Sequence, residues 1–308
     1  MAYIKMKHTD KISHMTVADA SDLFLKRCKV RNLSKRTVEF YGEILNHFFA
    51  HIPNIKYVDE ITQEVLDEFI MGEMERNNRI TSINTRLRGI YAFLHFCFKQ
   101  EYAESFQLSL LKEDETVKDP YTDEELTRLL KKPMSDQWTE WRSWAAINML
   151  IATGIRANTI VNIKICDVDF ENNSIHLRRL KNRKQQFIPL STSLKEVLKL
   201  YLKTWDWNPG DYLFPSQLNV QLAPHSMYAA IREYNISRNV MKTSLHLFRH
   251  TFAKNYILAG GGMVQLQSIL GHSTLNMTRK YVHLYGSDIQ KDFDLLNPLN
   301  RILEKNNS

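Results

Sequence analysis

The spacing of apolar residues is the strongest constraint on the fold. Between Thr16 and Gln100 apolar side chains recur every three to four positions, which is the spacing that lets an α-helix bury one face. The apolar positions of four successive stretches are Val17, Ala20, Phe24 and Leu25; Val38, Tyr41, Leu45 and Phe48; Val65, Leu66, Phe69 and Ile70; and Leu87, Ile90, Leu94 and Phe98. Ser34 is a candidate N-cap, and the fourth helix is expected to begin near Ser82. Residues 1–105 therefore predict a domain that is a four-helix bundle.

The helical pattern stops between Phe106 and Pro120. This stretch, FQLSLLKEDETVKDP, is acidic and irregular and ends in proline, which is typical of a linker. Thr122 and Glu125 follow with the spacing of a capping box, in which each side chain accepts a hydrogen bond from the other residue's backbone N–H. We therefore expect a linker over residues 106–120 and a second domain over residues 121–308.

The second domain combines helices with one short sheet. An apolar helix is expected from about Trp141 to Ala152, and helical periodicity resumes after Leu194. Between them, VDFENNSIHLRRLKNRKQQFIPL holds β-favouring stretches separated by polar turns at Asn172-Asn173 and around Asn182. The predicted fold class is mainly α, as α+β, with a small antiparallel sheet in a mixed helical domain.

Composition excludes several classes of protein. Of 308 residues, 44% are hydrophobic and 24% are charged, so collagen-like and disordered chains are excluded. The cysteines Cys28, Cys97 and Cys166 form no C-x-x-C pair, which excludes a disulfide framework and a cysteine-based zinc module and favours a reducing cytoplasm. We expect neither a signal peptide nor a membrane span, because no apolar run is long enough. The net charge of +7 is compatible with a polyanionic partner.

Four segments carry candidate chemistry. Arg156 follows a glycine-containing break in TGIRANTIVNI, and His246 and Arg249 are spaced i and i+3 in LHLFRHTFAKNYIL, so both side chains suit one anionic group. The segment RRLKNRKQQ is a basic hairpin tip, and Tyr281 lies on a helix that follows the glycine stop at Gly271. Taken singly, these residues also fit a helix cap, a solvated turn or a packed tyrosine. His246 and His250 have the i, i+4 spacing of zinc ligands, but the helix lacks the glutamate of H-E-x-x-H, and we expect no metal.

The order of these segments resembles a known family. The blocks ATGIRANT, LKNRKQQFIPL, HLFRHTFA and LGHSTLNMTRKYVH resemble, in this order, the tyrosine recombinases, which are the phage integrase family of site-specific recombinases. The resemblance spans roughly residues 119–290, and the helices before it look like the family's core-binding domain, a SAM-like bundle.

The resemblance implies a role for each motif residue. Arg156 and Arg249 would clamp the scissile phosphate, with His246 as the first histidine of the H-x-x-R box. The remaining assignments are the hairpin lysine, the histidine of LGHS and the nucleophile, at Lys181, His272 and Tyr281. Thr159 stands where family members often carry an acidic residue. The resemblance implies a 3′-phosphotyrosyl intermediate, and no cofactor is expected because rejoining conserves the phosphodiester energy.

Basic residues in stretches without carboxylates are candidate DNA contacts. Six basic and no acidic residues lie between Asp22 and Glu39, and the same holds between Glu171 and Glu196 and between Glu233 and Asp288. Such stretches suit a surface that approaches DNA phosphates. The candidate contacts, two of which lie outside these stretches, are Lys26, Arg27, Lys35, Arg36, Arg86, Arg88, Arg178, Arg183 and Lys184.

The expected partners are double-stranded recombination sites and further copies of this chain. The family assembles four subunits on two DNA sites, with a dimer on each site, and the apolar tail from Ser287 to Lys305 is expected to dock on a neighbouring protomer. We favour integration and excision of a mobile element in a bacterial or phage setting. The alternatives are a type IB topoisomerase, which only relaxes supercoils, and a catalytically idle DNA-binding regulator on the same scaffold. A metal-dependent nuclease is excluded by the scarcity of carboxylates around the motifs.

Overall fold

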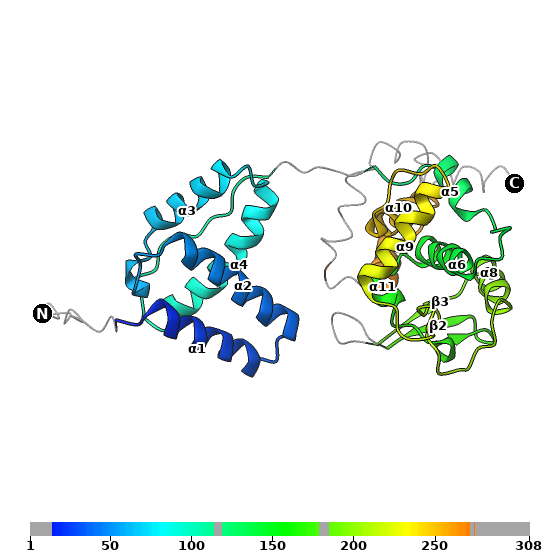
Figure 1. The fold of residues 1–308 in the computed structure, drawn as a ribbon, viewed down its shortest axis with the longest axis horizontal. Helices are drawn as coiled ribbons and strands as arrows, with labels where there is room; N and C mark the ends of the chain where they lie inside the picture. The colour runs from blue at the N-terminus through cyan, green and yellow to red at the C-terminus, as the bar shows by residue number, and fades with distance from the viewer. Residues whose placement is uncertain (1–13, 114–118, 179–184, 272–273, 275–308) are drawn as a thin grey trace, which may run out of the picture. The chain divides into compact units, whose positions relative to one another are not determined.

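The structure is a computed structural model that describes residues 14–113, 119–178, 185–271 and 274 (Figure 1). The chain divides into two compact units, residues 1–116 and 117–308. Each unit is built around its own hydrophobic core, and the two are described separately below. In the part of the chain that the structure describes, no helix combines the length and the apolar character needed to cross a bilayer.

The first unit is the predicted helical bundle. Its elements are α1 (Val17–Val30), α2 (Lys35–His51), the short 3-10 helix η1 (Val58–Glu60), α3 (Gln63–Glu75) and α4 (Ile80–Lys99). The predicted apolar stripes supply the core, since Phe24, Leu45 and Phe48 are buried together with Leu66 and Leu87. Ser34 caps α2 by accepting a hydrogen bond from the backbone N–H of Thr37 at 3.1 Å. The fourth helix begins at Ile80, slightly before its expected start.

The segment after α4 packs on the bundle. The side chain of Asn84 donates to the carbonyl oxygen of Leu111 at 2.8 Å and accepts from its backbone N–H at 2.9 Å. The hydroxyl of Tyr91 donates to the carbonyl oxygen of Ser109 at 2.7 Å, and the Phe106 side chain lies against the core. Residues 106–111, the first part of the expected linker 106–120, are thus attached to the first unit, and residues 114–118 lie outside the described residues.

The second unit is arranged around one central helix, α6 (Trp138–Thr153). The other helices are α5 (Asp123–Leu130), α7 (Ala157–Ile160), η2 (Ile165–Asp167), α8 (Thr192–Leu202), α9 (Pro224–Ser237), α10 (Leu245–Leu258) and α11 (Met263–Leu270). Helices α5, α8, α9 and α10 all pack against α6, which explains why its apolar residues do not form a single stripe (Figure 1). Thr122 and Glu125 form the predicted capping box at the start of α5.

The predicted antiparallel sheet has three strands, β1 (Val168–Asp169), β2 (Ser174–Leu177) and β3 (Gln186–Pro189), in the order β1-β2-β3. Ile175 in the middle strand lies opposite Val168 on one side and Ile188 on the other, and all three side chains are buried. Asn173 adopts a φ of 49° in the turn between β1 and β2, a conformation that asparagine tolerates well. The mainly helical α+β fold class is confirmed.

One expectation for the second unit is wrong in part. Helical periodicity does not continue unbroken after Leu194, because an irregular connection over residues 203–223 separates α8 from α9. Leu213 and Phe214 in this connection are fully buried, so it fills the core without forming a helix. A β-bridge between Lys164 and Tyr212 ties it to the segment after α7.

Candidate active site

A sharp turn at Gly154 brings Arg156 to the end of the central helix. Gly154 ends α6 in the left-handed conformation with a φ of 60°, and its N–H donates to the carbonyl oxygen of Leu150. A Cβ at this position would lie 2.4 Å from Phe252 and 2.8 Å from Leu270, so only glycine lets these two side chains pack here. Arg156 follows as the half-buried N-cap residue of α7.

Apolar residues of α10 pack in the core, and their packing determines how far His246 and Arg249 on the same helix are buried. Leu245, Leu247 and Phe248 are buried, and Phe248 stacks on Tyr121 with ring centroids 4.4 Å apart. Tyr121 also donates its backbone N–H to the Thr251 hydroxyl at 3.0 Å, which fixes the helix to the start of the unit.

The two residues predicted to share one anionic ligand lie at different depths. Arg249 is only 2% exposed, whereas His246 is exposed. The rings of His246 and His250 meet edge to face with centroids 4.7 Å apart. Of the predicted pair, the arginine is therefore embedded in the protein and the histidine lies nearer to solvent.

Arg249 connects two segments that are distant in sequence. Its Nη1 donates to the carbonyl oxygen of Gly154 at 2.8 Å, and its Nη2 donates to the carbonyl oxygen of Leu270 at 2.9 Å. Gly154 lies two residues before Arg156, and Leu270 lies two residues before His272. The two carbonyl oxygens orient the guanidinium. Because these acceptors are neutral, the two hydrogen bonds do not change the charge of the guanidinium.

The C-terminal end of α11 lies beside Arg249, which donates to the carbonyl oxygen of Leu270. Gly271 ends the helix in the left-handed conformation with a φ of 61°, as its predicted role as a stop requires. The motif residues Lys181, His272 and Tyr281 lie outside the described residues, as do Arg183, Lys184 and the tail from Ser287 to Lys305.

Four of the predicted DNA contacts lie near one corner of the first unit. Lys26 and Arg27 are close to the end of α1, Lys35 and Arg36 are at the start of α2, and all four are exposed. Because α1 and α2 pack together and are joined by a short turn, these cations occupy one region of the bundle surface.

Three other predicted contacts are engaged by carboxylates. Arg88 is exposed, with its Nη2 3.8 Å from an oxygen of Glu113. Arg178, at the end of β2, binds the buried side chain of Asp167, and this hydrogen bond raises the pKa of the guanidinium above its ordinary value. Arg86 donates to the carboxylate of Glu73.

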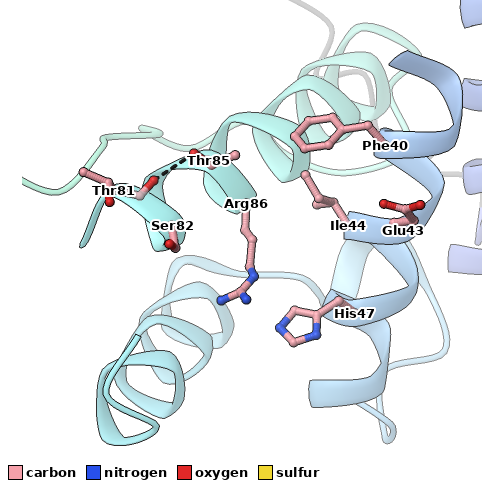
Figure 2. Close-up of a pocket in the computed structure, with 8 residues that line it drawn as sticks. All are labelled: Phe40, Glu43, Ile44, His47, Thr81, Ser82, Thr85 and Arg86. Carbon is pink, nitrogen blue, oxygen red and sulfur yellow. Dashed lines mark hydrogen bonds between the residues drawn. The ribbon is translucent and has the colours of Figure 1, made fainter. Parts of the chain in front are cut away.

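Glu73 is the centre of an ion-pair network in the bundle. Its carboxylate is fully buried and is contacted by Arg86, by Arg76 at 3.5 Å and by His47 Nε2 at 3.0 Å. Burial, and then the charges of Arg86 and Arg76, lower the pKa of His47. In Figure 2, His47 and Arg86 face each other across a pocket of about 450 Å³ between α2 and α4. The pocket is lined by Phe40, Glu43, Ile44, His47, Thr81, Ser82, Thr85 and Arg86.

No pattern in the sequence predicts this network. Among the described residues, the one group with metal-ligand geometry is His47, His51 and Glu73, whose candidate atoms lie within 4.8 Å of one another. Two guanidinium groups already contact the carboxylate, however, and would repel a metal cation. We interpret the group as a structural network that holds α2, α3 and α4 together.

Comparison with known proteins identifies the family. The family model described as "Phage integrase family" matches residues 121–287, which is more than half of the chain. The chain belongs to the phage integrase family. The predicted resemblance is thus confirmed, and with it the enzyme class, a tyrosine recombinase that breaks and rejoins DNA.

Named relatives of this phage integrase family member cover nearly its whole length. A tyrosine recombinase of Pseudothermotoga lettingae is 25% identical over 286 residues, which are 88% of this chain and 94% of that protein. The tyrosine recombinase XerC of Bacillus licheniformis is 26% identical over 292 residues, with 88% and 93% covered.

Solved structures share the fold. The Tn1549 transposon integrase in complex with transposon right end DNA has a TM-score of 0.73 at 21% identity, and 87% of this chain and 94% of that one are covered. A lambda integrase dimer bound to a COC′ core site has a TM-score of 0.69 at 15% identity, with 89% and 81% covered. At these identities the likeness concerns the fold alone.

Proposed function

We propose that this enzyme cleaves and rejoins specific DNA sites through a 3′-phosphotyrosyl intermediate on Tyr281. The observation that supports this best is the position of Arg249. One buried guanidinium bonds both the turn before Arg156 and the helix end before His272. Segments separated by about a hundred residues are thereby held at one place, as a site that acts on a single phosphate requires.

In the proposed reaction, the phenolic oxygen of Tyr281 gives its proton to solvent water and attacks the scissile phosphorus. Negative charge builds on the non-bridging oxygens, where Arg156 and Arg249 stabilise it together with the imidazoles of His246 and His272. A phenol has an ordinary pKa near 10, so these positive neighbours also favour the phenolate that attacks.

The leaving group is the 5′-oxygen of the cleaved strand. As the bond between phosphorus and this oxygen breaks, Lys181 supplies the proton that makes a free 5′-hydroxyl. The new phosphotyrosine bond replaces the broken phosphodiester, so attack by a 5′-hydroxyl reverses the reaction without ATP. Attack by the hydroxyl of another strand is recombination.

We further propose that the exposed cations of the first unit bind the DNA backbone. Lys26, Arg27, Lys35 and Arg36 occupy one corner of the bundle, where they can contact phosphates without leaving a buried ion pair. Arg86 is a weaker candidate, because it is bound to Glu73. Arg183 and Lys184, on the predicted hairpin, remain candidates from the sequence.

The proposed assembly is a dimer on each site and a homotetramer on two sites. Lambda integrase has been solved both as a dimer on a core site and as a tetramer bound to a Holliday junction, which supports this assembly by shared fold. We propose that the enzyme acts in the cytoplasm in the integration and excision of a mobile element. Circular DNA that joins the two flanks of the element in cells carrying the gene would support this role.

A suicide DNA substrate, nicked so that the cleaved product diffuses away, tests the chemistry. Wild-type protein should accumulate a covalent adduct, and Tyr281→Phe should form none, because phenylalanine has no oxygen to attack phosphorus. The matched control is Tyr285→Phe, which removes a hydroxyl four residues away and should leave the adduct in place. Adduct formation by Tyr281→Phe would refute the nucleophile.

DNA-binding and plasmid-relaxation assays with the same protein distinguish a recombinase from the two alternative functions. A DNA-binding regulator would shift the mobility of the site without forming any adduct. A type IB topoisomerase would relax plasmids that lack any specific site.

A further inference from the structure

We propose that Gln186 is a positioning residue for the active site, which fixes the end of α11 against the sheet. The side-chain amide of Gln186, the first residue of β3, donates to the carbonyl oxygens of Ser268 at 2.6 Å and of Ile269 at 2.8 Å. Neither the family match nor the relatives assign a role to this residue. The inference rests on the proposed function, because it concerns the same site.

The contact satisfies groups that a helix cannot satisfy itself. The last four carbonyl oxygens of an α-helix have no partner within the helix. At the end of α11, Arg249 binds the carbonyl oxygen of Leu270 and Gln186 binds that of Ile269. The carbonyl oxygen of Ser268 accepts both from Gln186 and from the backbone N–H of Gly271 at 3.1 Å. Side chains from the sheet and from α10 therefore hold successive carbonyls of one helix turn. This turn ends at Gly271, directly before His272.

Gly271 and Gln186 fit each other closely. A Cβ at Gly271 would lie 2.8 Å from Oε1 of Gln186, so a side chain at this position would push the amide away from the carbonyls. The φ of 61° is what favours glycine here, and a side chain at this position would also displace the Gln186 amide from the end of α11. The amide therefore lies directly against the last residue of the helix turn.

The position of Gln186 in the sequence explains why this contact matters for catalysis. Gln186 follows Lys181 by five residues, and β3 is paired with β2 along its whole length. Strand β3, which follows the proposed proton donor Lys181, is thereby attached to α11, which precedes His272. Arg249, on α10, attaches α11 to the Gly154 turn. Gln186 and Arg249 therefore connect the end of α11 to three segments: β3, α10 and the Gly154 turn.

The neighbouring Gln185 provides a matched control. Gln185 is exposed, and its Oε1 lies 3.2 Å from Nε2 of His176 on β2. Gln186→Met keeps the length of the side chain and removes both donors, and Gln185→Met makes the same change where α11 is not involved. Gln186→Arg restores N–H donors at the same position.

The experiment measures two quantities on full-length protein: the Kd for the DNA site, and the single-turnover rate of adduct formation at saturating DNA. For Gln186→Met we expect a rate lower by about tenfold or more, because small misplacements of reacting groups are costly, with a Kd within about twofold of wild type. Gln186→Arg should recover most of the rate, and Gln185→Met should match wild type. A wild-type rate in Gln186→Met, or equal losses of rate and DNA binding, would overturn the proposal.

Hydrogen exchange supplies a readout that does not depend on activity. In the DNA-free protein, Gln186→Met should exchange the backbone amides of residues 268–271 faster than wild type, and Gln185→Met should not. Unchanged exchange in Gln186→Met would contradict the positioning role even if cleavage is lost. If wild-type protein forms no adduct, the proposed function fails, and the exchange result still decides whether Gln186 holds the helix end.

Discussion

Each unit contains a buried charged side chain, Glu73 in the bundle and Arg249 in the second unit, and the two differ in the partners that hold them. In the bundle, the buried carboxylate of Glu73 is surrounded by Arg76, Arg86 and His47. In the second unit, the buried Arg249 donates to neutral main-chain carbonyl oxygens. The first arrangement holds helices together by placing one buried negative charge against the positive charges of two arginines. In the second, two main-chain carbonyl oxygens orient the guanidinium, and the role in phosphate binding that we propose for Arg249 needs such an orientation.

The largest expected effect is on catalysis, through Arg249→Lys. Lysine keeps the positive charge but cannot bond both carbonyl oxygens and a phosphate in the planar geometry of a guanidinium. We expect adduct formation from the suicide substrate to slow by about 100- to 1000-fold, the usual cost of losing a donor to the developing charge.

Arg238→Lys is the control for this change. Arg238 is paired with a carboxylate, since its Nη2 lies 2.6 Å from Glu140. We expect this variant to cleave within about twofold of wild type, because its charge is already used within the protein. Similar losses in both variants would show that the effect at Arg249 does not depend on its position beside the Gly154 turn and the end of α11.

The next effect is on the stability of the bundle, through Glu73→Leu. Removing the carboxylate leaves Arg76, Arg86 and His47 facing one another, and we expect the bundle to lose about 2–3 kcal/mol of unfolding free energy. The control is Glu39→Leu, whose pair with Lys35 is exposed and should contribute less than about 1 kcal/mol.

The two units can be followed separately in this experiment. Every tryptophan lies in the second unit, at positions Trp138, Trp141, Trp144, Trp205 and Trp207. Far-ultraviolet circular dichroism reports both units, whereas tryptophan fluorescence reports the second. Glu73→Leu should shift the dichroism transition and leave the fluorescence transition in place. A shift of both would show that the network does more than stabilise the bundle.

The smallest effect is a pH dependence of the bundle that comes from His47. Its pKa in the folded protein is lowered from 6.5, so the unfolded chain binds more protons, and stability is lost as the pH falls through about 6.5. We expect the melting temperature of the bundle to fall more between pH 7.5 and 5.5 in wild type than in His47→Gln. The exposed His95 is the control, and His95→Gln should keep the wild-type dependence.

Local signals predicted much of the fold. Ser34, the capping box of Thr122 and Glu125, and the stops at Gly154 and Gly271 all act within a few residues of their own position, and the structure confirms each. Apolar periodicity likewise predicted the four helices of the bundle, because a helix that covers a core needs one continuous apolar face.

Features that depend on distant partners were missed. Arg86 looked like a DNA contact, but Glu73 on another helix binds it. The first part of the expected linker, residues 106–111, packs on the bundle through Asn84, a polar residue within a helix whose pattern gives no sign of a partner at Leu111. Gln186 was one of two adjacent glutamines in a basic hairpin, and only the folded chain distinguishes them. The positions predicted for Lys181, His272 and Tyr281 stay predictions.

The acceptors that hold Arg249 have a consequence for how the sequence can diverge. Both belong to the main chain, so no substitution at Gly154 or Leu270 can delete them. A substitution disturbs the bonds only by changing the path of the backbone, which the left-handed turn at Gly154 restricts to very few residues. The two bonds are therefore insensitive to the side chain at position 270. Among the residues that form them, the arginine and the glycine are the ones whose substitution is costly.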